Sequence, residues 1–177
     1  MTTPNEIEEA IENAAKAFQG ASGKDEREKG FESTELPAEE VQMRKGCRAL
    51  TLVQELLPNG TPGDLTYKRY YTAAIELSFN VIERSCQAAL ISTGHFNEDE
   101  HHPHTVVLKT SHRAGHWDPD AAAGLANLYK ENRSKFYYRE GVPSETRAKG
   151  MLDVAKHLHH HLAEQDETLG DTCLCDQ

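Results

Sequence analysis

The chain has 177 residues, of which 37% are hydrophobic and 27% are charged, and its formal net charge at pH 7 is −10. This length suits one domain with a core of its own, and the acidity argues against a protein that coats nucleic acid nonspecifically, because phosphate binding needs clustered lysine and arginine. No apolar run approaches the roughly 18 residues that span a bilayer, and the acidic N-terminus lacks a signal-peptide pattern. We therefore expect a cytoplasmic protein with reduced cysteines.

The N-terminal part of the sequence predicts a short helix followed by a linker. Residues 1–18 carry apolar side chains at helical spacing, including Ile7, Ile11 and Phe18, whereas residues 19–35 are rich in glycine, serine and charge. Such a composition is typical of a flexible linker. We expect the main domain over residues 36–164, with Pro37 at the start of its first helix, and a polar tail over residues 165–177.

Helical periodicity recurs in five segments of the main domain, namely residues 37–57, 65–94, 104–115, 118–138 and 144–162. The second is the longest and is closed by Gly94, while Asp118 and Ser144 are suited to cap the fourth and fifth. No segment shows the alternation of a strand, and no internal repeat is visible. The predicted fold class is therefore all-α, a four- or five-helix up-down bundle.

The order of these features resembles the HEPN domain, a helical bundle named for nucleotide binding in higher eukaryotes and prokaryotes. The stretch "KRYYTAAIEL", with Arg69, Tyr70 and Tyr71, is close to the start of the long helix in that family. "HPHTVVLK" is similar to its short helix near a histidine, "LANLYKENRSKFYY" to its arginine-bearing helix, and "SETRAKGMLDVAKHL" to its closing helix. The resemblance covers residues 65–162 and implies a bundle of HEPN type.

The sequence departs from the nuclease-active branch of that family where the chemistry would occur. There an arginine is followed by a histidine after four to six residues, whereas here Tyr138 stands at the first such position after Arg133. Arginine can stabilise phosphate charge, and histidine suits proton transfer because its pKa is about 6.5, but tyrosine is a poor base. The candidate catalytic residues are Arg133, Tyr138 and Tyr137, and the candidate substrate-binding residues are Asn132, Arg69 and His104.

The resemblance implies a domain that binds nucleotide or RNA in a groove containing Arg133. It would be a degenerate metal-independent ribonuclease or the partner of a nucleotidyltransferase in a toxin–antitoxin-like pair, and an active form would be an endoribonuclease. A homodimer is expected because HEPN-like domains pair. The alternative is a noncatalytic structural or protein-interaction bundle, in which Arg133 pairs with a carboxylate or a helix end and Asn132 is a satisfied core residue.

The ten histidines raise the question of a metal site. Two pairs have the four-residue spacing at which one helix can present two zinc ligands, His112 with His116 and His157 with His161. Cys173 and Cys175 add thiols, but C-x-C alone is a weak signal. His159 falls within the apolar stripe of the last helix. The favoured interpretation is a solvated histidine face with one core or interface histidine, so we expect no metal and no cofactor.

Overall fold

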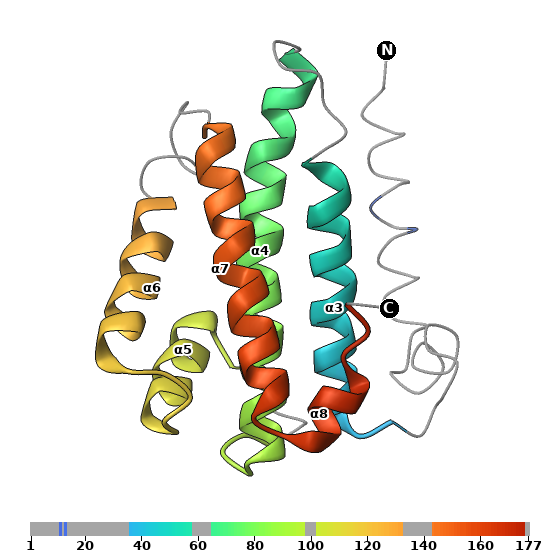
Figure 1. Ribbon diagram of the computed structural model, residues 1–177, viewed down its shortest axis with the longest axis vertical. Helices are drawn as coiled ribbons and strands as arrows, with labels where there is room; N and C mark the ends of the chain where they lie inside the picture. The colour runs from blue at the N-terminus through green and yellow to red at the C-terminus, as the bar shows by residue number, and fades with distance from the viewer. Residues whose placement is uncertain are drawn as a thin grey trace. The chain divides into compact units, whose positions relative to one another are not determined.

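The computed structural model describes residues 36–57, 65–97, 102–132 and 143–175, together with residues 11 and 13, and for residues 65–69 it describes the backbone alone (Figure 1). The chain divides into two compact units, Met1–Leu36 and Pro37–Gln177. The helix and linker predicted for residues 1–35 lie outside the described residues, apart from Ile11 and Asn13, which are helical. All the helices below belong to the second unit.

The described residues of the second unit form six helices: α3 (Ala38–Leu56), α4 (Leu65–Ser92), α5 (His104–Arg113), α6 (Pro119–Asn132), α7 (Glu145–Glu164) and α8 (Glu167–Thr172). No strand occurs among the described residues. The all-α bundle predicted from the sequence is therefore confirmed. Within the same residues no helix is both long enough and apolar enough to cross a membrane.

The long helix α4 lies at the centre, packed between α3 and α7 (Figure 1). Helices α4 and α7 run in the same direction: Tyr71 near the start of α4 donates to Glu145 at the start of α7, with 3.3 Å between Oη and Oε2, and Ser92 at the end of α4 donates to Asp166 just after α7. Helix α3 runs antiparallel to both (Figure 1). The parallel pair arises because α5 and α6 intervene between α4 and α7 in the chain.

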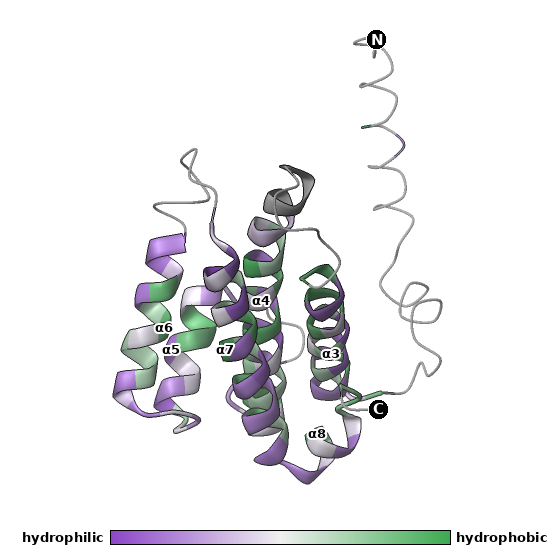
Figure 2. Cartoon of the chain, turned by 45° about the horizontal axis from the view of Figure 1, so that its top comes forward, coloured by the Kyte–Doolittle hydropathy of each residue, from purple (hydrophilic) through white to green (hydrophobic). Residues whose placement is uncertain are grey.

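The core lies where these three helices face one another, and Figure 2 shows the polar residues of α7 on its outer face. Because neighbours cover α4 on several sides, its buried face is wide and rich in small residues that allow close helix packing. Ser78 and Ser85 are the fully buried polar residues on this face, and their hydroxyls donate to the carbonyls of Ala74 (2.7 Å) and Val81 (2.8 Å) one turn earlier. Both hydroxyls are thus satisfied without leaving the helix.

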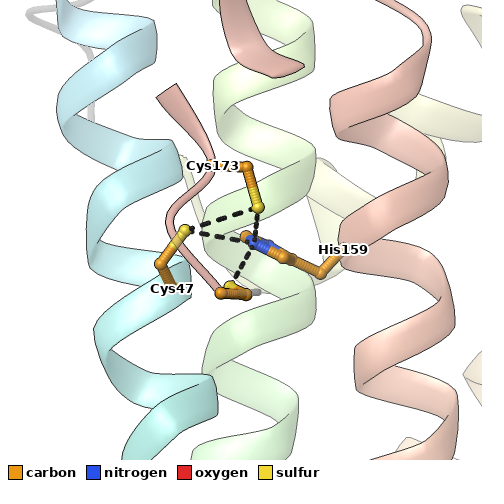
Figure 3. Close-up of side chains that lie close together, drawn as sticks. Cys47, His159 and Cys173 are labelled. Atoms are coloured by element: carbon orange, nitrogen blue, oxygen red, sulfur yellow. Dashed lines mark hydrogen bonds between the residues drawn. The ribbon is translucent and has the colours of Figure 1, made fainter. Parts of the chain in front are cut away.

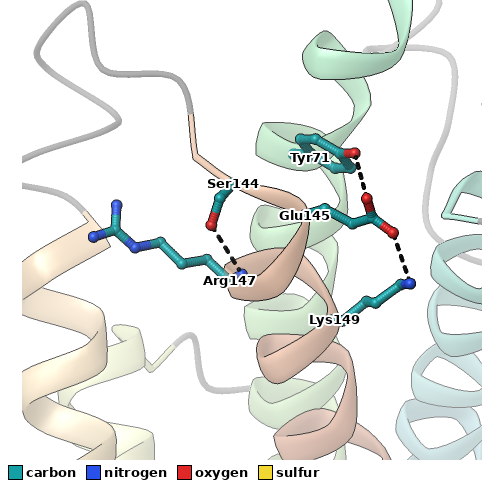
Figure 4. Close-up of polar contacts among 5 residues, drawn as sticks. All are labelled: Tyr71, Ser144, Glu145, Arg147 and Lys149. Carbon is teal, nitrogen blue, oxygen red and sulfur yellow. Dashed lines mark hydrogen bonds and ion pairs between the residues drawn. The ribbon is translucent and has the colours of Figure 1, made fainter. Parts of the chain in front are cut away.

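The start of α7 is fixed by polar contacts (Figure 4). The backbone N–H of Arg147 donates to the Ser144 hydroxyl at 3.4 Å, which makes Ser144 the N-cap as predicted. Lys149 Nζ lies 2.6 Å from Glu145 Oε1, and the hydrogen bond and the positive charge of Lys149 lower the pKa of the Glu145 carboxyl. The Arg147 side chain extends the other way, toward α6 (Figure 4).

A polar tail was predicted for residues 165–177, but its described part, residues 165–175, packs onto the bundle through α8. Asp166 caps this helix by accepting from the backbone N–H groups of Thr168 (2.9 Å) and Leu169 (3.3 Å). Leu169 is fully buried, and α8 contacts both α3 and α7. Two leucines in a polar stretch were too weak a signal for a helix, but the burial of Leu169 docks the segment and brings its two cysteines to the bundle.

Candidate metal centre

Four potential metal ligands from three separate segments converge between α3 and α7, and Figure 3 labels three of them, Cys47, His159 and Cys173. Cys47 comes from α3, His159 from α7, and Cys173 and Cys175 from the residues that follow α8. Their ligand atoms all lie within 4.8 Å of one another. Cys47 and His159 are buried, with 4% and 0% exposure, and the other two cysteines are half-buried. The cluster therefore lies at the edge of the core, beneath the C-terminal segment.

Four of the six distances between these atoms are known individually and are close to the edges of a small tetrahedron. The Sγ atoms of Cys47 and Cys173 are 3.8 Å apart. His159 Nε2 lies 3.3 Å from each of those sulfurs and 3.2 Å from Cys175 Sγ. Tetrahedral zinc with bonds of about 2.3 Å to sulfur and about 2.05 Å to nitrogen requires edges of about 3.8 Å and about 3.6 Å. The S···S edge agrees, and the S···N edges are slightly shorter.

The orientation of the His159 ring is set from behind by Ser85. The Ser85 hydroxyl donates its hydrogen to the Val81 carbonyl, so its oxygen is free to accept from His159 Nδ1–H at 2.7 Å. A proton on Nδ1 leaves Nε2 with a lone pair in the neutral ring, and that lone pair faces the three sulfurs. A ligand histidine in a metal site is commonly held in this way, with its second nitrogen donating to a protein acceptor.

Electrostatic interactions within the cluster are strong. Burial lowers the pKa of His159, but hydrogen bonds to the sulfurs of Cys173 and Cys47 outweigh it and raise this pKa to about 9. The pKa of Cys173 is lowered, chiefly by hydrogen bonds from Cys175 and Cys47. The backbone N–H of Leu174 donates to Cys47 Sγ at 3.4 Å. The surroundings thus favour a thiolate next to a positive charge. A proton on His159 can provide that positive charge, and so can a bound metal cation.

The donor set identifies the kind of metal that would fit. Three thiolates and one imidazole at tetrahedral spacing suit zinc, whereas calcium and magnesium require oxygen ligands. Four protein ligands complete the coordination shell, so no position is left open for water or substrate. The fourth cysteine, Cys86, is fully buried away from this cluster, and burial raises its pKa to about 12. It is an inert core residue and a natural control.

Gly46 of α3 lies against His159 of α7 and leaves little room for a side chain, so its replacement tests whether the imidazole is held in place. A Cβ atom at Gly46 would lie 3.2 Å from Cε1 and Nδ1 of His159 and 3.3 Å from Ser85 Oγ. A metal-bound imidazole has no freedom to retreat, so we expect Gly46→Ala to lower the free energy of unfolding by about 1–3 kcal/mol. Gly124→Ala, where a Cβ would meet nothing within 4 Å, should raise it by about 0.5–1 kcal/mol.

Urea unfolding of the zinc-loaded proteins measures both changes in free energy. Equal stabilisation by the two alanines would show that His159 moves freely, and would contradict a fixed imidazole at this position.

The hydrogen bond from His159 to Ser85 gives a second prediction. Ser85→Ala removes the acceptor for Nδ1–H, and loss of such a partner typically weakens metal binding about 10–100-fold. Ser78→Ala is the matched control, because Ser78 is equally buried on the same helix and makes the same kind of bond to its own helix. Competition with a chromophoric zinc chelator measures the affinities. Equal affinities in the two variants would mean that Ser85 does not orient a ligand.

The residues that the sequence suggested for catalysis, Arg133, Tyr137 and Tyr138, lie outside the described residues. Arg69 lies in α4, and its side chain is not described. Asn132 is buried at the end of α6 and donates through Nδ2 to Glu76 at 2.5 Å, as a satisfied core residue does. His104 stacks on Tyr129 with 4.9 Å between ring centroids. None of these described residues touches the cluster of sulfurs.

The histidine pairs suggested by the four-residue spacing do not form a cluster of three or more ligands among the described residues. His157 and His112 donate through Nδ1 to the carbonyls of Asp153 (2.7 Å) and Trp117 (3.2 Å). His161 Nε2 bonds the carbonyl of His116 at 3.0 Å. These imidazoles serve local hydrogen bonds. The expectation of no metal site overlooked a set whose members are separated in sequence by up to 128 positions, from Cys47 to Cys175.

Two signals for the metal centre were nevertheless present in the sequence. His159 is the histidine that falls within the apolar stripe of its helix, and the C-x-C pair follows it by only 14 residues. A polar residue on a core face requires a partner. The sequence contained no sign that Cys47 belongs to the same set, because no motif near Cys47 marks it as a ligand.

Comparison with known families identifies a match that covers almost the whole chain. Residues 2–175 match the model of a family described as Domain of unknown function (DUF8154). Neither the curated proteins nor the solved structures include a match to the chain. The match includes all four residues of the cluster, Cys47, His159, Cys173 and Cys175. The chain belongs to the DUF8154 family.

Proposed function

We propose that this protein is a zinc-binding helical bundle in which a Cys₃His centre fastens the C-terminal segment to α3 and α7. The observation that carries the proposal is the convergence of three sulfurs on the Nε2 atom of His159, at 3.2–3.3 Å, with Nδ1 of the same ring held by Ser85. A closed set of four protein ligands suits a structural site rather than a catalytic one. Zinc binding is then part of the folding energy.

The metal would solve a physical problem that the cluster poses. Three thiol groups this close cannot all ionise without a cation, because like charges at such distances raise one another's pKa. The pKa of Cys175 is raised, first by its hydrogen bonds with Cys173 and Cys47, then by burial, and also by the charges of the same two cysteines. Zinc offsets the repulsion between thiolates and links segments that are distant in the sequence. The short helix α8 has only six residues, too few to be stable alone, and gains most from the link.

The test is the metal content of the full chain, purified without a histidine tag and dialysed against metal-free buffer. We expect one zinc per chain by elemental analysis, retained by the Cys86→Ala variant and lost in Cys173→Ser/Cys175→Ser. Cobalt substituted for zinc should give the intense charge-transfer absorption of thiolate ligands. Absence of zinc after reconstitution, or equal zinc in the double variant, would contradict the proposal.

We also propose, on the HEPN resemblance, that the chain binds nucleotide or RNA near Arg133, as a homodimer or with a nucleotidyltransferase partner. The observation that favours this second function is a pocket of about 280 Å³ between α4, α6 and α7, whose polar lining consists of Glu131, Asn132 and Arg147 among apolar side chains. Asn132 directly precedes Arg133 in the chain. A ligand in this pocket would contact the residue that directly precedes Arg133 in the chain.

Titration with labelled RNA and with nucleotides at modest salt tests this second function. Binding that is lost in Arg133→Ala and kept in Arg48→Ala, on the exposed side of α3, would support it. The absence of any binding would leave the noncatalytic bundle as the correct alternative. Cleavage abolished by Arg133→Ala would identify an endoribonuclease, and sedimentation measures the oligomeric state.

A further inference from the structure

A second and larger cavity, of about 620 Å³, lies between α5 and α6. Its volume is within the range of about 300–1,000 Å³ typical of small-molecule sites. The metal ligands do not line it, and neither does Asn132. It is therefore distinct from both sites considered above, and its lining has a chemistry of its own.

The charge of this lining is opposite to that of the whole chain. Lys109, Arg113 and Lys130 all line the cavity, and no aspartate or glutamate does, although the formal net charge of the chain is −10. Within the described residues, no side-chain ion pair or hydrogen bond engages any of the three. Lys109 and Arg113 are four residues apart on α5, a spacing at which like charges repel. A bound anion would relieve that repulsion.

Aromatic side chains complete the lining. Trp117 and Tyr129 both border the cavity, and His104, stacked on Tyr129, extends the flat surface. The Trp117 backbone is held through its carbonyl, which accepts from His112 Nδ1 at 3.2 Å. Trp117 Nε1 is buried and has no acceptor among the described residues. A buried donor without a partner carries a cost that a ligand oxygen in reach of it would remove.

We propose that the α5–α6 cavity binds a small phosphorylated compound that carries a flat aromatic ring. The phosphate would be held by Lys109, Arg113 and Lys130. Three cationic side chains match the two negative charges of a phosphate better than the one charge of a carboxylate. The ring would stack against Trp117 and Tyr129. The overall acidity disfavours a long polyanion, which would have to approach a negative surface, whereas a small dianion meets chiefly the local field of the cavity.

The cavity contains its own reporter, because Trp117 is the only tryptophan in the chain. Tryptophan fluorescence of the full, zinc-loaded protein is to be titrated with phenyl phosphate, with inorganic phosphate and with benzyl alcohol. We expect saturable change with phenyl phosphate, at least about tenfold weaker binding of inorganic phosphate, and none with benzyl alcohol. Equal affinity for both phosphates would overturn the stacking role, and the absence of saturation by phenyl phosphate would overturn the proposal.

Charge variants separate a built site from general attraction to cations. Lys109→Gln/Arg113→Gln should weaken phenyl phosphate binding at least about tenfold, since hydrogen bonds to charged groups each contribute substantially. The control Lys156→Gln/Arg48→Gln removes the same charge from α7 and α3 and should leave the affinity unchanged. Both exposed residues of the first pair are dispensable for the core, and an unchanged circular dichroism spectrum verifies folding. Equal weakening by both double variants, or a fluorescence change with RNA but not with phenyl phosphate, would contradict the assignment.

Discussion

Cys47→Ser is expected to abolish stoichiometric zinc binding and to lower the free energy of unfolding by about 4 kcal/mol when free zinc exceeds the dissociation constant about 1,000-fold. The effect is large because Cys47 is the one ligand contributed by α3, and it holds both α7 and the C-terminal segment through the centre. Serine keeps the size of the side chain but does not provide a thiolate. Zinc content and urea unfolding at fixed free zinc measure the two changes.

Cys86→Ala is the control for this experiment. Cys86 is fully buried on α4 but lies outside the cluster, so alanine should cost only the packing of one sulfur atom, about 1–2 kcal/mol, with zinc retained. If Cys47→Ser lowered the free energy of unfolding equally with and without zinc, Cys47 would contribute only by packing in the core. Equal zinc content in Cys47→Ser and the control would contradict its role as a ligand.

Leu169→Ala should produce the second large effect. Leu169 is the fully buried side chain that anchors α8, and leucine-to-alanine changes in a core cost about 2–5 kcal/mol. Because α8 positions Cys173 and Cys175, weaker docking should also lower zinc affinity. Thermal unfolding with and without chelator separates the two contributions: the cavity cost persists without zinc, and the loss of affinity appears only with it.

Leu174→Ala is the matched control for Leu169→Ala. Leu174 stands between the two cysteines but is 44% exposed, so its side chain should contribute within about 0.5 kcal/mol. If Leu169→Ala were as mild as Leu174→Ala, α8 would not be docked on the core. If Leu174→Ala alone reduced zinc binding, the centre would depend on local packing of the segment rather than on α8.

The parts of the fold that the sequence predicted are those governed by local chemistry. Asp118 accepts from the backbone N–H of Ala121 at 2.7 Å and begins α6 as its capping pattern indicated. Gly94 ends α4 with a φ of 72°, in the left-handed region that glycine tolerates best. Pro37 immediately precedes α3 rather than opening it. Periodicity and caps act within a few residues, so a single sequence shows them directly.

The metal centre could not be predicted in the same way, because it depends on tertiary contacts. The position of Cys47 against His159 follows from the pairing of α3 with α7 across α4, which no local pattern encodes. Leu169 is the fully buried side chain of α8, and without the docking of this helix the C-x-C pair would be only the end of a polar tail. The visible signs in the sequence were the place of His159 on an apolar stripe, where a polar residue needs a partner, and the C-x-C pair that follows it.

Zinc K-edge X-ray absorption of the purified full chain tests the central claim most directly, because it measures the identity and the distance of the ligand atoms. A zinc centre of this kind should give a four-coordinate shell with three sulfurs at about 2.3 Å and one nitrogen at about 2.0–2.1 Å. The Cys86→Ala variant should give the same spectrum. A shell dominated by oxygen or nitrogen, or a protein that holds no zinc after reconstitution, would contradict this claim.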